Sequence, residues 1–444
     1  MEYLRSMIFL FILFLGFALF TKSIKKIFRN IQLGKTSYRT DQKGKRWKTM
    51  LFVALGQSRM NKRPIAGFLH VLVYLGFVVV NIDFIEIMID GVLGTNRFFS
   101  NIFPPFIYNA FTAILDIFAL LVIISVIIFY IRRNILHIKR LNMYELKGWP
   151  KNDANYILIF EFLLMLAFLT INACESILQQ RGETMSLGYF PVSIGLIVPI
   201  INQMNLSTIS LEYIKDFFWW FHVVGVLFFV NYLYYSKHLH IFLAFPTTWF
   251  SNLSKKGKLD NLDAVTREVR LMLNPNIDPY AATERDPKED VTEKFGASDI
   301  FDLTSVQLMS AYSCTECGRC TAVCPANITG KKLSPRKIMM DTRDRLEEVG
   351  RNIEKNGTYK DDDKKLLDHY IQREELRACT TCNACVEACP ILIDPLSIIM
   401  QLRRYMIMEE SSAPRGWNMM MTNIENNGAP WQYSRTDRLN WAKD

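Results

Sequence analysis

The first 246 residues alternate between long apolar runs and short polar stretches, whereas the rest of the chain is mostly polar and charged. A helix needs about 20 apolar residues to cross a bilayer. The segments that approach this length predict five membrane-spanning helices: Tyr3–Phe20, Ile65–Ile89, Phe106–Ile131, Tyr156–Leu178 and Ile214–Phe245. A further run, Pro191–Ile201, is short and contains prolines, so we expect a re-entrant or interfacial piece. The pattern predicts an all-α membrane domain over residues 1–246.

Basic residues predict the orientation of these helices. The polar stretches after the first and third segments are rich in Lys and Arg, and the other two are nearly free of them. Short loops of the first kind stay in the cytoplasm. We therefore expect a multi-pass protein of the cytoplasmic membrane, with its N-terminus outside and everything after Phe245 inside. The formal charge of +9 lies beside apolar segments, which favours membrane lipid over nucleic acid as its partner.

Two copies of C-x-x-C-x-x-C-x-x-x-C-P follow the membrane segments. In this motif the first three thiolates bind one [4Fe–4S] cluster and the fourth binds the other. The predicted ligands of the first cluster are Cys314, Cys317, Cys320 and Cys389. The predicted ligands of the second are Cys379, Cys382, Cys385 and Cys324. Two zinc sites are the alternative, but zinc sites usually pair two C-x-x-C units and do not use the proline-terminated positions. The ninth cysteine, Cys174, is interpreted as a packing residue.

The motifs divide the second half of the chain into three parts. The predicted divisions are a charged connector (247–296), a helical domain with two [4Fe–4S] clusters (297–410) and a C-terminal tail (411–444). The connector holds a predicted turn at Asn274–Pro279 and a solvated charge run at Lys288–Lys294. Ser334–Arg377 is helical in pattern, with a break at Asn356-Gly357.

The dicluster region resembles the helical ferredoxin domains of the heterodisulfide reductase C subunit and the anaerobic glycerol-3-phosphate dehydrogenase C subunit. Those families also use a cysteine-rich CCG module, whereas this chain has no adjacent Cys-Cys pair. The resemblance implies that a catalytic thiol or disulfide site belongs to another polypeptide. The expected partner is a cytoplasmic redox protein with a CCG domain or a flavin.

Four histidines lie within or at the ends of the predicted spans: His70, His222, His238 and His240. Ionisable groups inside membranes are costly and are usually functional. In one continuous helix, the 18 residues from His222 to His240 make about five turns, so both would share a face roughly 27 Å apart. His70 and His240 then share a depth near the cytoplasmic side. They are the predicted axial ligands of one b-type haem, with interfacial polar residues as the alternative.

The remaining intramembrane polar residues have open roles. His222 is either a quinone contact or a packed residue, and His238 is expected at the interface. Asp83 and Glu86 approach the outer face, where their burial cost should be small. The deeper Asp116 either relays protons or pairs with a polar neighbour.

Residues 1–245 are similar in layout to the cytochrome b (gamma) subunit of respiratory nitrate reductase and its relatives in sulfite-reduction and heterodisulfide-reductase complexes. The stretches Gly67–His70, Trp220–His222 and His238–Pro246 carry this similarity. It implies haem and quinone chemistry in the membrane. That family's second span carries two ligands ten residues apart, where this chain has His70 and Val80. The departure predicts no outer haem.

These features predict a membrane-bound electron-transfer subunit that links the quinone pool, through haem b and two [4Fe–4S] clusters, to a cytoplasmic redox partner. The tail residues Trp417, Trp431 and Trp441 are a candidate contact for that partner. One alternative is a haem-free membrane anchor and iron–sulfur wire for a flavoprotein or CCG-domain oxidoreductase. Another is a regulatory membrane protein that uses its clusters as sensors.

Overall fold

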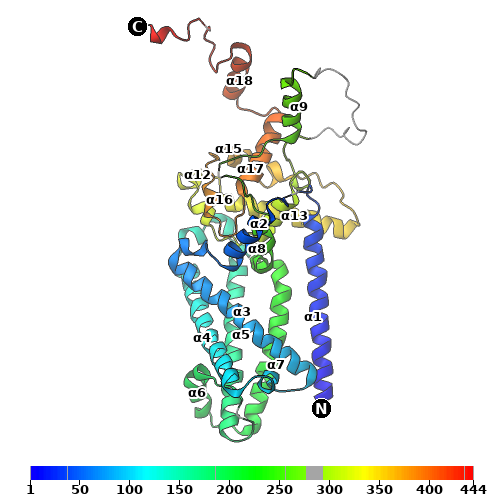
Figure 1. The fold of residues 1–444 in the computed structure, drawn as a ribbon, viewed down its shortest axis with the longest axis vertical. Coiled ribbons are helices and arrows are strands. Elements are labelled where there is room, and N and C mark those ends of the chain that lie inside the picture. The colour runs from blue at the N-terminus through cyan, green and yellow to red at the C-terminus, as the bar shows by residue number, and fades with distance from the viewer. Residues whose placement is uncertain are drawn as a thin grey trace.

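The apolar segments fold as long helices, which the computed structural model describes within residues 2–37, 39–185, 187–255, 257–276, 294–434 and 436–443. Regular structure in these ranges is helical, and the only strand-like pairings there are isolated bridges. Figure 1 shows a helical domain stacked on one end of the long helices, with the N-terminus at the opposite, distal end. The predicted Asn274–Pro279 turn and Lys288–Lys294 charge run lie largely outside the described residues.

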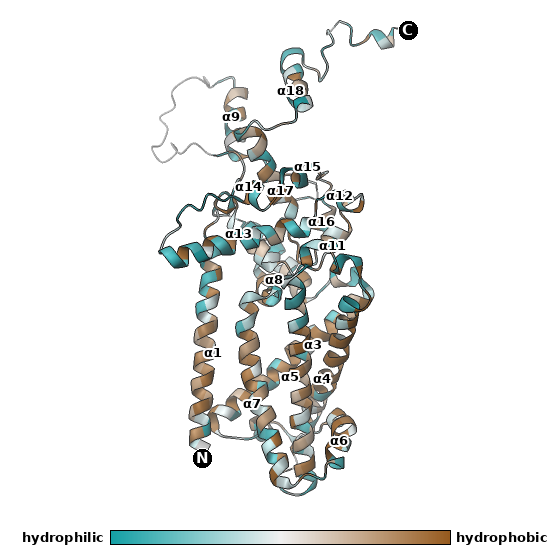
Figure 2. Ribbon diagram, turned by 180° about the vertical axis from the view of Figure 1, so that it is seen from behind, coloured by the Kyte–Doolittle hydropathy of each residue, from teal (hydrophilic) through white to brown (hydrophobic). Residues whose placement is uncertain are grey.

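Five helices have the length and composition to cross a membrane, as predicted. They are α1 (Glu2–Ile31), α3 (Pro64–Leu93), α4 (Pro105–Asn134), α5 (Trp149–Gln180) and α7 (Thr208–Tyr232). A helix satisfies its own backbone polar groups, as a lipid environment requires. Large apolar side chains cover the outside of these helices, including Phe14 (75% exposed) and Phe106 (83% exposed) (Figure 2). So large an apolar surface is that of a membrane protein.

Short helices join the long ones. They are α2 (Lys43–Met50), η1 (Leu51–Leu55), η2 (Met60–Lys62), η3 (Phe98–Asn101), η4 (Lys139–Leu141), η5 (Tyr144–Leu146), η6 (Ser193–Ile197) and α6 (Val198–Gln203). The last two form the short apolar piece expected near Pro191–Ile201, and they lie at the distal end (Figure 1). Asp116 is fully buried and accepts bonds from the backbone N–H groups of Val192 (2.7 Å) and Ser193 (2.9 Å). It therefore pairs with polar neighbours and fixes the start of η6.

The last span departs from the predicted continuous helix Ile214–Phe245. The elements after α7 are η7 (Leu233–Tyr235), η8 (Lys237–Leu239) and α8 (His240–Trp249). Between η7 and η8, Ser236 takes extended angles (φ −110°, ψ 150°), and its hydroxyl accepts a bond from the His238 N–H (3.0 Å). A serine that bonds the backbone locally competes with helix continuation. The predicted alignment of His222 and His240 on one helix face is therefore wrong, because the two residues belong to different helices.

The cluster domain is a set of short helices around one long one. They are η9 (Ile300–Asp302), α10 (Ser305–Ser313), α11 (Arg319–Ala322), α12 (Pro325–Ile328), α13 (Pro335–Asn356), α14 (Leu366–His369), α15 (Arg373–Arg377), α16 (Ala384–Ala388), α17 (Pro395–Arg404) and η10 (Tyr405–Glu409). The Ser334 hydroxyl caps α13 and Pro335 occupies its first turn, both common at helix starts. The helix ends at Gly357 (φ +81°), as the Asn356-Gly357 pair predicts.

Membrane helices contribute directly to the core of the cluster domain. Ile27 and Ile31 of α1, with Leu239 and Leu243 beside α8, are buried in the same apolar cluster as α10, α13 and α17. Helix α1 therefore runs past its predicted end at Phe20. Lys26 pairs with Glu354 on α13 (2.9 Å), and the Asn30 amide donates to the Tyr312 hydroxyl (2.9 Å). The two regions thus share a continuous interface.

The C-terminal tail extends away from this core (Figure 1). It contains α18 (Arg415–Asn427) and η11 (Asn440–Ala442), while α9 (Asp263–Leu273) belongs to the connector. Trp417, Met420 and Ile424 share one face of α18 and are each more than two-fifths exposed. Trp431 and Trp441 are also exposed.

Candidate electron-transfer site

The fold brings Cys389 beside the first motif. Burial raises the pKa of the Cys389 thiol to about 12, and the neighbouring Cys317 and Cys314 raise it further. Burial also raises the pKa of Cys320 well above its ordinary value, with added effects of Cys314, Cys317 and Cys389. The four predicted ligands of the first cluster are therefore neighbours in space, and we call them the first cysteine set.

The other four cysteines surround a small cavity. Cys324, Cys379, Cys382 and Cys385 line it together with Leu333, Leu396 and Ile399. These four thiols form the second cysteine set, in the combination predicted from the motif. The apolar wall limits water access, one of the factors that tune cluster potentials. The two sets are adjacent, because Cys385 also contributes to the raised pKa of Cys320.

Both motifs bend the backbone in the same way. The residue before the second cysteine has positive φ in each copy, at Glu316 (55°) and Thr381 (56°). The residue after it does so too, at Gly318 (70°) and Asn383 (59°). Paired left-handed turns point successive N–H groups inward and create an anion-binding concavity. Such a loop suits a negatively charged iron–sulfur–thiolate centre.

The structure also bears on how metal could be held. In the ranges it describes, no three His, Cys, Asp or Glu side chains converge closely enough to hold a single metal ion. A cubane distributes its four thiolate ligands over four irons and does not require that convergence. Backbone N–H groups already face sulfur, from Thr381 to Cys379 (3.4 Å) and from Ile393 to Cys389 (3.3 Å). Such bonds set cluster potentials.

A buried ion pair ties the first motif to the break in the last span. The Lys237 ammonium lies 2.5 Å from Glu316, which sits between Cys314 and Cys317. Burial alone would raise the pKa of Glu316, but Lys237 and Arg343 hold it below its ordinary value. The Lys237 carbonyl accepts a bond from His240 Nδ1 (3.1 Å). One residue thus contacts both the cluster loop and a candidate haem ligand.

Basic loop residues of the membrane domain hold the cluster loops. Arg59 donates to the Cys389 carbonyl (3.4 Å), and Arg140 donates to the Cys317 carbonyl. Glu145 forms an ion pair with the fully buried Arg336 (2.7 Å). Sequence reasoning assigned these arginines to topology alone. Their positions beside the motifs depend on tertiary contacts that no local pattern encodes.

His70, His238 and His240 come together beneath the cluster domain. The rings of His238 and His240 are 5.5 Å apart. Burial lowers the pKa of His238, and so do the charges of His240, Lys237 and His70. The Nδ1 atoms of His70 and His238 are buried without a hydrogen-bond partner. His240 donates through Nδ1, which leaves Nε2 for a ligand bond, the arrangement usual for metal-bound imidazole. The site therefore offers the donors a haem would need.

His222 lies apart from this group. It is 1% exposed, its Nδ1 contacts the Leu164 carbonyl (3.1 Å), and its ring packs against Phe168 (5.9 Å between centroids). These contacts are those of a packed residue, one of its two predicted roles.

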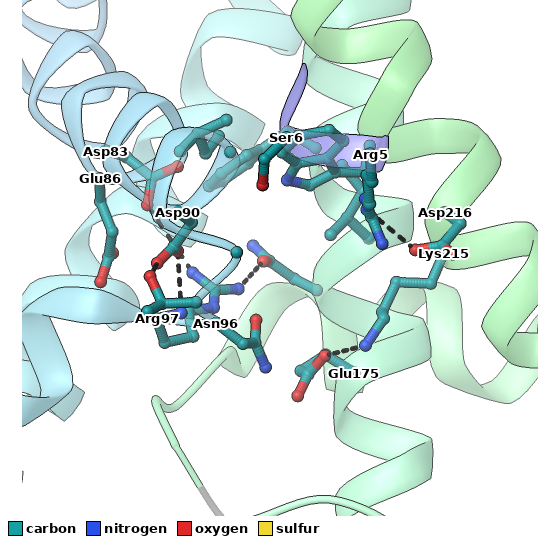
Figure 3. A pocket seen from close by; sticks show the side chains of 18 residues that line it. Arg5, Ser6, Asp83, Glu86, Asp90, Asn96, Arg97, Glu175, Lys215 and Asp216 are labelled. Carbon is teal, nitrogen blue, oxygen red and sulfur yellow. Dashed lines mark hydrogen bonds and ion pairs between the residues drawn. The ribbon is translucent and has the colours of Figure 1, made fainter. Parts of the chain in front are cut away.

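A polar pocket opens at the distal end, where α1, α3, α5 and α7 meet (Figure 3). Arg97 is its central cation, 3.7 Å from Asp83 and 2.9 Å from Asn172. Glu175 pairs with Lys215 (2.9 Å), as Figure 3 shows. Asp83 and Glu86 are only 2% and 1% exposed, so the expectation of a small burial cost is wrong. Arg97 compensates them, and it follows α3 in a loop that the topology argument treated as nearly uncharged.

Comparison with known proteins supports the iron–sulfur assignment. Residues 313–392 match the family described as "4Fe-4S dicluster domain". Over 99% of its length the chain is 28% identical to the "Probable iron-sulfur-binding oxidoreductase FadF" of Bacillus subtilis, of which it covers 61%. Over 92% of its length it is 23% identical to the "EtfAB:quinone oxidoreductase" of Syntrophomonas wolfei, of which it covers 55%. The chain thus spans less than two thirds of these relatives.

A third relative concerns only part of the chain. It is the "Probable membrane-anchored ferredoxin" of Chromohalobacter salexigens, 30% identical over 35% of this chain and 25% of that protein. The similarity to heterodisulfide reductase is to its D subunit, whereas the motif spacing resembles its C subunit. No solved structure matches the chain. The chain is thus related to iron–sulfur oxidoreductases, while the resemblance to nitrate reductase cytochrome b stays a prediction.

Proposed function

We propose that this chain transfers electrons between the membrane quinone pool and a cytoplasmic redox partner, through one b-type haem and two [4Fe–4S] clusters. The observation that carries the proposal is the contact of Lys237 with both the first cysteine loop and His240. It joins two candidate redox centres through one residue. The name of the relative EtfAB:quinone oxidoreductase supports the quinone link.

The positions of the centres favour one order of carriers. The first cysteine set lies against the membrane domain, through Glu316 and Cys389. The second set reaches the surface, because Cys382 is the one exposed cysteine in the described ranges. Electrons would therefore pass between the histidine site and the partner through the first cluster and then the second. The distal N-terminus fits the expected outside location.

The residues that would hold the haem are His70 and His240. A bound haem would supply a one-electron carrier between a two-electron quinone and the one-electron clusters. The protein's own contribution is to orient His240 through the Lys237 carbonyl and to exclude water around His70. A quinone contact at His222 is part of the proposal only if the ring can leave its contact with Leu164.

The partner would be a flavin-containing or CCG-domain protein, and EtfAB is a candidate because it stands in the name of a relative. The test is anaerobic purification into lipid nanodiscs, followed by addition of menaquinone to the dithionite-reduced protein after removal of excess dithionite. We expect about eight iron and eight sulfide per chain, a b-haem spectrum, and cluster reoxidation by quinone. Clusters that form without haem and ignore quinone would favour the haem-free wire. Zinc in place of iron would overturn both.

A further inference from the structure

A groove runs beside the exposed end of the second cysteine set. Four chain segments build it: the loop after α1, the loop after α8, the second motif and α17. Its basic lining residues, which we call the basic groove, are Arg39, Arg59, Lys255, Lys258 and Arg404. Cys382 and Asn383 lie in the same wall.

The acidic residues in this lining are already engaged. Asp260 lies 3.8 Å from Arg39, and Glu387 pairs with Lys62 (2.6 Å). Asp394 accepts a bond from the Ser397 N–H (3.0 Å) and caps α17. Five basic groups thus face three compensated carboxylates, and Lys255 and Lys258 stand exposed at the rim. The groove therefore presents a net positive field to an approaching molecule.

The redox geometry of the groove differs from that of the first set. Cys314 is buried, and Cys317, Cys320 and Cys389 are only partly accessible. Cys382 is exposed and lies in the groove wall, so a cluster held by the second set would come nearest to solvent here. A protein that docks in the groove would place its own redox centre as close as this surface permits.

We propose that the basic groove is the docking surface for the redox partner, and that the partner presents an acidic surface to it. This rests on the proposed function and adds where the partner binds and what charge it carries. Redox complexes are often small and transient, and complementary charge raises their association rate. Each encounter would move one electron between the second cluster and the acceptor centre, with no bond made or broken.

The test uses two protein probes of opposite charge. Ferric cytochrome b5, which is acidic, and ferric cytochrome c, which is basic, each accept one electron from the dithionite-reduced clusters, and stopped-flow records both rates. We expect cytochrome b5 to lose about tenfold in rate between low and high salt, because screening removes electrostatic steering. The double variant Lys255→Glu/Lys258→Glu should slow cytochrome b5 about three- to tenfold at low salt and speed cytochrome c.

The matched control is Lys355→Glu/Lys360→Glu, with the same change of charge. Lys355 and Lys360 are exposed, and Lys355 lies 20 residues along α13 from Pro335 in the wall of the second cavity, roughly 30 Å away. The control should leave both rates unchanged. Equal slowing of cytochrome b5 by both double variants would overturn the proposal, as would no response to either. Dithionite loads the clusters without quinone, so failure of the quinone link would leave this result intact.

Discussion

The cluster domain and the membrane domain position their candidate ligands in different ways. Each cysteine set takes three members from one short loop and the fourth from the other loop, and both loops bend at equivalent positions. The histidine site takes His70 from a long apolar helix and His240 from the start of a separate short helix. Loop spacing is a local property, whereas the histidine site depends on how a helix ends at Ser236. A short motif therefore specifies the first kind of site and only restricts the second.

The largest expected effect tests the exchange of ligands between the two loops. Cys389→Ser should remove the cluster of the first motif although its sequence change lies in the second motif. Cys324→Ser should do the reverse. Iron content should fall by about half in each case, and electron paramagnetic resonance should show that a different cluster remains.

Cys174→Ala is the control, because this cysteine is fully buried in α5 and far in sequence from both motifs. It should retain both clusters. Loss of the same cluster in Cys389→Ser and in Cys379→Ser would contradict the crossed sets.

The next effect tests the histidine site. His70→Ala and His240→Ala should each abolish the reduced-minus-oxidised b-haem spectrum, because haem held by two axial imidazoles needs both helices. His222→Ala should retain it, since His222 is packed against Phe168 away from the other three. Retention of full haem in His240→Ala with loss in His238→Ala would exchange the roles of these neighbours. A wild-type spectrum with two haems would contradict the single site.

A third effect tests the contact between the two regions. Lys237→Met leaves Glu316 buried without its nearest cation, and breaking a buried pair costs about 3–5 kcal/mol. Thermal unfolding followed by cluster absorbance should show the loss. Lys237→Met/Glu316→Gln should recover most of it, because no unpaired charge remains. Lys215→Met, at the distal Glu175 pair, should leave the cluster spectrum unchanged.

Acid should weaken this contact with a definite sign. Lys237 and Arg343 hold the pKa of Glu316 below its ordinary value, so the pairing contributes fully above the unfolded pKa of about 4.3. The contribution is lost as the pH falls below about 4.3 toward the lowered pKa of the folded protein. The difference between wild type and Glu316→Gln should therefore shrink on acidification. A difference that grew would contradict the assigned direction.

Much of the fold could be predicted from sequence because its signals are local. The five spans, the helix break at Gly357 and the grouping of the cysteines follow from run length, turn residues and spacing. The interruption at Ser236 could not, because an apolar run reads the same with or without it. The roles of Arg59 and Arg140 were explained by topology, and their contacts with the cluster loops became visible only when distant segments met.

The smallest expected effect concerns the tail. Deletion of residues 412–444 removes the exposed apolar face of α18 and should weaken co-purification of the partner, leaving cluster content unchanged. The triple variant Trp417→Ala/Trp431→Ala/Trp441→Ala should reproduce part of the loss. Recovery of every partner after the deletion would leave the basic groove as the docking surface without help from the tail.

The account's central claim is that the two regions form one electron path, and rapid freeze-quench of the nanodisc-bound protein tests it most directly. Reduced EtfAB is mixed with oxidised protein in the presence of menaquinone, and cluster and haem signals are recorded over time. We predict reduction of the clusters first, then of the haem, then formation of menaquinol. With Cys389→Ser, reduction should stop at the second cluster. Menaquinol formation at an unchanged rate in that variant would contradict the path.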